Sequence, residues 1–143
     1  MDMKKLLTGT IVGGIVLYAA GWLIWDVLFA DFYAANAGSA ENLWRDAPIM
    51  WAGIAGMLPM AALVTMALGK CENASIHAGI KVGAIIGGLA WLSVNLLFYS
   101  LSNMNELTLV LVDPILEAVR TGLAGAAIVV VLGMTAGSGS TDY

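Results

Sequence analysis

Long apolar runs alternate with short polar segments along the chain. The apolar runs cover about residues 6–30, 49–68, 76–101 and 107–133, and charged or loop-forming residues separate them. Each run is close to or above the roughly 20 residues that a helix needs to cross a bilayer. A soluble bundle would require a polar face on each helix, which these segments lack. The pattern predicts an all-α integral membrane fold: one domain with a four-transmembrane-helix bundle, and a flexible tail over residues 134–143.

The composition favours lipid as the main solvent and excludes several function classes. Of the 143 residues, 60% are hydrophobic and 11% are charged, whereas soluble domains have about 45–50% and about 25%. A net charge of -4 with six basic residues offers no electrostatic footprint for nucleic acid. The single Cys71 and single His77 exclude an internal disulfide and a bis-histidine haem. We therefore expect no cofactor, no metal site, no catalytic residues and no enzyme activity.

The distribution of basic residues predicts the orientation of the chain. Lys4 and Lys5 precede the first apolar run, and Lys70 and Lys81 flank the connection between the second and third. The first connection holds one arginine against three acidic residues, and the third holds no basic residue. Because basic residues remain on the cytoplasmic side of a membrane, both termini are predicted to be cytoplasmic.

An internal match suggests that the chain arose by duplication. A shift of 69 residues places residues 21–29 on 90–98, aligning two Trp-Leu…Phe segments. The same shift places residues 53–56 on 122–125, aligning two Gly-x-Ala-Gly segments. Each unit would contain two spans, so both copies would enter the membrane in the same direction. The sequence thus predicts a tandem duplication of a two-helix hairpin, in which Asp26 takes the position of Asn95.

Small residues recur at helical spacing within the apolar runs. Gly79, Gly83 and Gly87 form one stripe on the third run, and Gly122 lies in a similar pattern on the fourth. Hydrophobic burial cannot drive association within lipid, so helices there associate through close approach of their backbones. These glycines are expected to pack helices inside the chain, with self-association as the alternative.

Ionisable residues within the spans are the sharpest chemical signal. Asp113, Glu117 and Arg120 share one face of the fourth span through i+3 and i+4 spacing. Glu117 would lie about 15 Å below the outer end of this span at 1.5 Å per residue, where a bare charge costs about 2.5–3.5 kcal/mol or more. Asp26 and Asn95 are expected at a similar outer depth. The five should face the protein interior or a water-filled crevice.

Two interpretations of this intramembrane polar cluster remain open. In the structural one, Arg120 neutralises Glu117, Asn95 pairs with Asp26 or Asp113, and the cluster sets the register of the helices. In the functional one, the excess of carboxylates over guanidinium binds a cation or relays protons. The tryptophans in the outer halves of the spans are in part interfacial anchors.

Several segments resemble a family of small four-span bacterial inner-membrane proteins that carry a domain of unknown function. The resemblance rests on residues 4–14, 21–26, 31–39 and 111–114 and extends over nearly the whole chain. It implies a multi-pass protein of the bacterial inner (cytoplasmic) membrane. The family has no established activity, so the resemblance transfers no functional residue.

The sequence leads to two main functional hypotheses, and to a third in which the protein contacts a lipid or pigment through its outer tryptophans. The first is a small noncatalytic inner-membrane protein that acts through helix packing, as a homo-oligomer or as an accessory subunit of a membrane complex. The alternative is a small ion-coupled transporter or cation-binding membrane protein that uses the intramembrane acidic cluster. In both cases the lipid bilayer is the main partner.

Overall fold

The computed structural model describes residues 1–41, 45, 47–71 and 74–137. Four of its helices are long and apolar enough to cross a membrane, and their bounds are Met3–Leu28, Met50–Leu68, Ile76–Leu101 and Leu107–Gly133. These bounds lie within three residues of the predicted ones. The prediction of an all-α, multi-pass membrane bundle is therefore confirmed.

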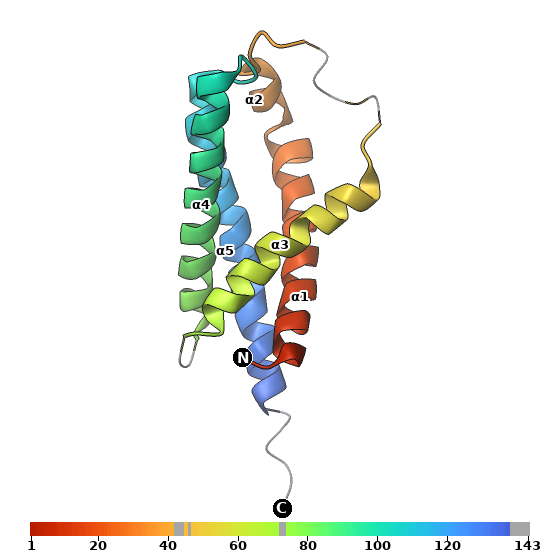
Figure 1. Cartoon of the computed structure of the whole chain (residues 1–143), viewed down its shortest axis with the longest axis vertical. Coiled ribbons are helices and arrows are strands. Elements are labelled where there is room, and N and C mark those ends of the chain that lie inside the picture. The colour runs from red at the N-terminus through yellow and green to blue at the C-terminus, as the bar shows by residue number, and fades with distance from the viewer. Residues whose placement is uncertain (42–44, 46, 72–73, 138–143) are drawn as a thin grey trace, which may run out of the picture.

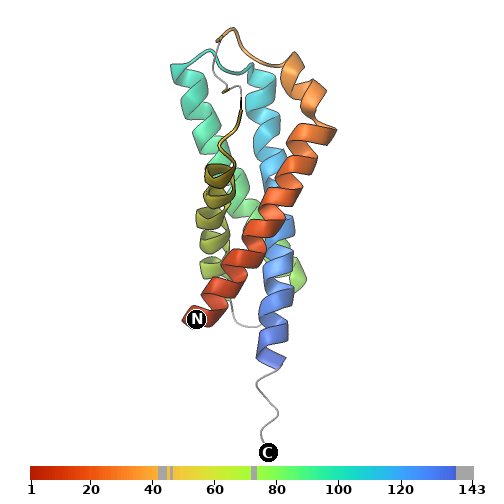
Figure 2. The ribbon, with the colours of Figure 1, turned by 90° about the vertical axis from the view of Figure 1, so that its right-hand side faces the viewer.

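In chain order the elements are α1 (Met3–Gly21), the π-helical segment η1 (Trp22–Leu28), α2 (Ala30–Ala35), α3 (Met50–Leu68), α4 (Ile76–Leu101) and α5 (Leu107–Gly137). The long helices run alternately up and down, and α1 begins at the end of the bundle where α5 finishes (Figures 1 and 2). α4 and α5 lie side by side, α1 lies along α5, and α3 crosses the bundle obliquely. The short helix α2 lies at the opposite end of the bundle.

Local capping explains where two of the helices begin. The Asp2 side chain accepts a hydrogen bond from the Lys5 backbone N–H at 2.7 Å, and Ser75 accepts one from Ala78 at 3.2 Å. Such caps satisfy backbone donors that lack a partner in the first turn of a helix. At the other end of the chain α5 continues to Gly137. Residues 134–137 of the predicted tail are therefore helical, and 138–143 lie outside the described residues.

The predicted glycine stripe forms the contact between α4 and α5. A Cβ atom added to Gly79 would overlap the backbone of Gly125, and one added to Gly83 or Gly87 would overlap Thr121. Because only a residue without a side chain allows this approach, the two backbones come into direct contact. The structure thus places the stripe inside the chain rather than on the lipid-facing surface.

Gly122 completes this interface from the α5 side. A Cβ atom added to it would lie 3.3 Å from the Ile80 carbonyl oxygen and 3.6 Å from the Ala84 Cβ. This contact is looser than those of the α4 glycines, although it lies on the same face. All four glycines predicted to pack helices therefore lie between α4 and α5.

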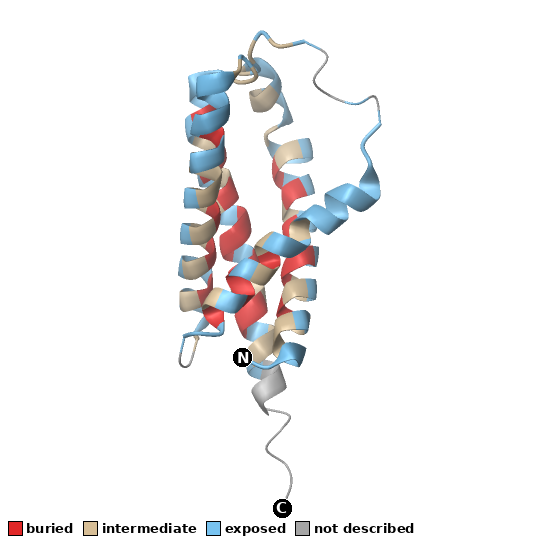
Figure 3. Ribbon diagram, viewed as in Figure 1, coloured by how far each residue is buried: buried red, intermediate tan, exposed pale blue. Residues whose placement is uncertain are grey.

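The helix α3 joins the bundle mainly through its second half, with Met57 as the partly buried residue of its first half. Its buried residues are Ala61, Val64, Thr65 and Leu68, and the half that begins at Met50 is exposed (Figure 3). The two hairpins therefore differ, because α4 and α5 lie together along their length whereas α3 diverges from η1 (Figure 1). The duplication of a hairpin stays a prediction.

We predict that Gly83→Ala destabilises the protein, because the added methyl group overlaps the Thr121 carbonyl group. Overpacking of this kind costs about 1–3 kcal/mol of unfolding free energy. Gly53→Ala is the matched control, since nothing lies within 4 Å of its Cβ position and alanine is the better helix former. Unfolding in mixed micelles, followed by circular dichroism, measures both; equal stability of the two variants would contradict this packing.

Candidate functional site

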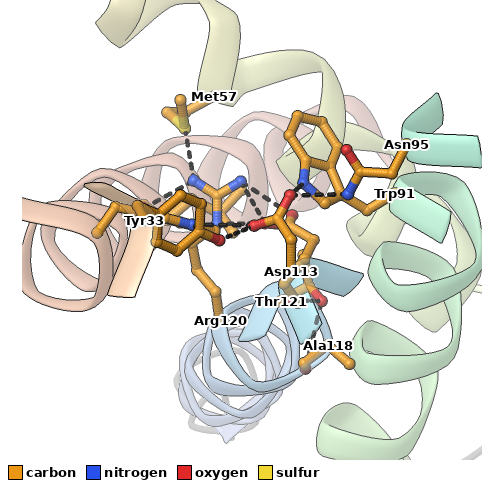
Figure 4. A network of polar contacts seen from close by, with 11 residues as sticks. Tyr33, Met57, Trp91, Asn95, Asp113, Ala118, Arg120 and Thr121 are labelled. Atoms are coloured by element: carbon orange, nitrogen blue, oxygen red, sulfur yellow. Dashed lines mark hydrogen bonds and ion pairs between the residues drawn. The ribbon is translucent and has the colours of Figure 1, made fainter. Parts of the chain in front are cut away.

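Six polar or charged side chains are buried among the described residues, and most of them lie close to one another between the helices (Figure 4). They are Thr65, Asn95, Asp113, Glu117, Arg120 and Thr121. α5 supplies four of them, because its i+3 and i+4 spacing places them on the face directed at the other helices. This network contains two anionic groups, Asp113 and Glu117, which are satisfied in different ways.

The Asp113 carboxylate accepts four hydrogen bonds from neutral donors. Its Oδ1 accepts from the Trp25 indole N–H at 3.0 Å and from the Tyr33 hydroxyl. Its Oδ2 accepts from the Trp91 indole N–H at 2.5 Å and from the Asn95 amide at 2.8 Å. A carboxylate offers about four acceptor positions, so this one is saturated. Asp113 thereby connects α5 to η1, α2 and α4.

The Glu117 carboxylate is held by a guanidinium one turn away on the same helix. Arg120 donates from Nε to Glu117 Oε2 at 2.8 Å and from Nη2 to Oε1 at 2.9 Å. Two parallel hydrogen bonds of this kind form a strong bidentate ion pair. Glu117 has 0% of its surface exposed and Arg120 8%, so the pair is enclosed at the middle of its span.

The remaining donor groups of Arg120 connect this ion pair to the first hairpin. Its Nη1 lies 3.4 Å from the Leu17 carbonyl oxygen and 3.3 Å from the Met57 sulfur. Its Cζ lies 4.7 Å from the centroid of the Trp25 ring, within the range of a cation–π interaction. Arg120 therefore joins α1, η1 and α3 to α5.

Backbone contacts at the end of the bundle that holds α2 position the Tyr33 side chain. Gly38 donates its backbone N–H to the Met104 carbonyl at 2.8 Å, and Glu106 donates to that of Asn36 at 3.0 Å. These bonds hold the segment after α2 against the α4–α5 connection. The Tyr33 hydroxyl also accepts the Trp25 indole N–H at 2.5 Å. Burial, and then the hydrogen bond to Asp113, raise the pKa of Tyr33 well above its ordinary value.

Of the five residues that the sequence assigns to the polar cluster, the structure brings four together and leaves Asp26 out. Asp26 is exposed on η1, and in the described part of the chain it has no hydrogen bond or ion pair. Of the two partners that the sequence leaves open for Asn95, the structure pairs it with Asp113 and not with Asp26. Trp25 donates to Asp113, and the adjacent Asp26 points away because neighbouring residues of a helix point in different directions.

Sequence reasoning missed the three aromatic donors. The sequence assigns its tryptophans only in part to the membrane interface and does not single out Trp25 or Trp91, although a buried indole N–H usually finds a hydrogen-bond partner. Tyr33 carried no such signal, because it lies outside the apolar runs and 80 positions before Asp113. Its role depends on the tertiary fold.

The polar network is closed, in the sense that its buried groups are hydrogen-bonded within the chain. Within the described ranges, no buried side-chain nitrogen or oxygen lacks a hydrogen-bond partner, and no group of three or more potential metal ligands occurs. A cation could reach Asp113 or Glu117 only by displacing donors that the chain itself supplies. Comparisons with family models, with curated proteins and with solved structures find no match for this chain.

We predict that Arg120→Leu destabilises the protein strongly, because it leaves Glu117 buried without its partner. The loss of one partner of a buried ion pair costs about 3–5 kcal/mol of unfolding free energy. The double replacement of Glu117 and Arg120 by leucine should cost less than Arg120→Leu alone, since no bare charge remains. Unfolding in mixed micelles measures Arg120→Leu, Glu117→Leu and the double variant, with Glu106→Gln as an exposed control. A double variant as unstable as the sum of the single ones would contradict the pairing.

We predict that Tyr33 stays protonated at a pH where tyrosine ordinarily ionises, near pH 10. Its pKa is raised in the folded state, so its stabilising contribution is complete below the unfolded-state value and is lost as the pH rises further. Absorbance at 295 nm measures ionisation, and the difference between the native protein and Tyr33→Phe isolates this residue. The same difference measured on the unfolded chain in denaturant is the control. Similar titrations of Tyr33 in the folded and unfolded chains would refute the buried contact with Asp113.

Proposed function

We propose that this protein is a noncatalytic membrane protein that acts through helix packing, as a homo-oligomer or as an accessory subunit of a larger membrane complex. The observation that carries the proposal is the closure of the polar network. Asp113 is saturated by four neutral donors, and Glu117 forms a bidentate pair with Arg120. Groups that are bonded in this way determine how helices fit together.

The same observation weakens the alternative of an ion-coupled transporter that uses the acidic cluster. A carrier site must exchange its protein contacts for the ion in each cycle. Glu117 would have to give up two charge-assisted hydrogen bonds in an enclosed site, which is costly in a low-dielectric environment. A structural role therefore accounts better for this geometry.

The exposed half of α3 supports assembly with another helix. Gly53 and Gly56 have nothing within 4 Å of their Cβ positions, and Trp51 is 74% exposed. Small residues on a lipid-facing surface allow a second helix to approach closely. The chain itself covers the second half of α3 but leaves this half free for a partner.

Location and orientation are part of the same proposal. Lys4 and Lys5 lie where α1 begins, at the end of the bundle where α3 also finishes (Figure 1). Under the positive-inside rule this end faces the cytoplasm, and the family resemblance favours a bacterial inner membrane. The internal match of residues 21–29 with 90–98 supports a duplicated hairpin.

We predict that Gly56→Leu removes the assembly while leaving the subunit intact. Nothing lies within 4 Å of the Cβ position of Gly56, so we expect the thermal stability of the subunit to be unchanged. It would block a partner helix, so the higher-mass species should be largely lost. Native gel electrophoresis and cross-linking of mildly solubilised membranes measure the mass distribution.

Gly133→Leu is the matched control, because Gly133 also has open space at its Cβ position but lies near the far end of α5. Co-purification of two differently tagged copies would identify a homo-oligomer, and capture of another membrane protein an accessory role. A monomer whose reconstituted vesicles conduct protons, with conduction lost in Glu117→Gln, would overturn the proposal in favour of a carrier.

A further inference from the structure

A cavity of about 320 Å³ lies beside the polar network, between the α1–η1 helix and α3. Asp26 and Arg120 line it together with Trp22 and Trp25 of η1, and Met57 of α3 contributes to the opposite side. Its volume is at the lower end of the range for small-molecule sites. The structural role of the network makes no use of this cavity or of Asp26.

The charges around the cavity favour a cation. Arg120 contributes no free positive charge, because Glu117 neutralises it through two hydrogen bonds. The nearby Asp113 has only neutral donors, and Asp26 has no partner in the part of the chain that the structure describes. The local balance is three carboxylates against one guanidinium. An anion is disfavoured here, whereas a positive group would neutralise Asp26.

The shape and lining of the cavity indicate what kind of cation it suits. Asp26 lies two residues before the end of the Met3–Leu28 span, close to the outer surface of the membrane. The lining continues nine positions inward to Leu17, which is on the order of 10 Å along a helix. Trp22, which is 60% exposed, lies between them. Aromatic faces attract ammonium groups, and the deeper lining with Leu17 and Met57 accommodates hydrocarbon.

We propose that this cavity binds an organic ammonium compound with an apolar body. The ammonium group lies against the Asp26 carboxylate and the face of Trp22, and the apolar body extends toward Leu17 and Met57. An aminophospholipid headgroup and a free lipophilic amine share this chemistry. The site is formed within one chain, but Gly53 lines the cavity and also belongs to the α3 face proposed for assembly. Binding is therefore also measured on Gly56→Leu, so that a failure of the assembly and a failure of this site can be told apart.

The test uses the full chain in nanodiscs of phosphatidylglycerol, which carries no amine. Benzyltrimethylammonium is the probe, and neopentylbenzene, which has the same shape without the charge, is its neutral control. Titration calorimetry and tryptophan fluorescence follow binding. We expect the cation to bind more tightly than the neutral analogue. We expect Asp26→Asn to raise the Kd of the cation about tenfold, which corresponds to a loss of about 1.4 kcal/mol of binding free energy. Binding of the neutral compound should not change.

Two controls separate this effect from unfolding or from a change in net charge. Asp31→Asn also removes one negative charge, from an exposed residue of α2 that lies outside the cavity lining, and it should leave the affinity unchanged. Trp22→Leu should weaken cation binding and reduce the fluorescence response. Asp26 makes no contact that folding requires, so both asparagine variants should unfold like the native protein. Equal cation affinity of Asp26→Asn and the native chain would overturn the proposal, as would equal affinity for the charged and neutral compounds.

A lipid comparison identifies the source of the ammonium group. If a phosphatidylethanolamine headgroup is the occupant, replacing part of the phosphatidylglycerol with this lipid should weaken probe binding in the native protein and not in Asp26→Asn. If a free amine is the occupant, the lipid should leave the affinity unchanged. Both results support an ammonium site, and they assign it to different ligands.

Discussion

A charge inside hydrocarbon must find its partners within the protein, and the rest of this structure depends on that constraint. Insertion of a bare aspartate or arginine at mid-membrane costs several kcal/mol. Glu117 and Arg120 avoid most of this cost by pairing, and Asp113 by collecting four donors. Because those donors come from η1, α2 and α4, satisfying one carboxylate fixes the relative position of all these elements.

Close backbone contact and polar bonding hold different parts of the bundle. α4 and α5 approach so closely at Gly79, Gly83 and Gly87 that dispersion forces act along their whole contact. The first hairpin instead contacts α5 through side chains, with Ile128 against Gly13 and with Arg120 reaching Leu17 and Met57. The bundle is therefore a tight α4–α5 pair to which α1 and one half of α3 are attached.

Features that depend on local spacing could be predicted from the sequence, and features that depend on tertiary fold could not. The length of an apolar run determines whether it spans a bilayer, and spacings of three and four place Asp113, Glu117 and Arg120 on one face. The direction in which Asp26 points depends on the π-helical geometry of η1. Tyr33 lies near Asp113 because the segment after α2 is hydrogen-bonded to the α4–α5 connection.

Trp25 links the closed network to the open cavity. Its indole N–H donates to Asp113, its ring lies against the Arg120 guanidinium, and its side chain lines the cavity that contains Asp26. A cation bound by Asp26 and Trp22 would lie in the same cavity as the Trp25 ring and Arg120, and two positive groups repel each other at short range in a poorly screened environment. Occupancy of the cavity would therefore shift Trp25 or strengthen the attachment of Arg120 to Glu117. In either case a residue of η1 would transmit ligand binding to the contacts that join the two hairpins.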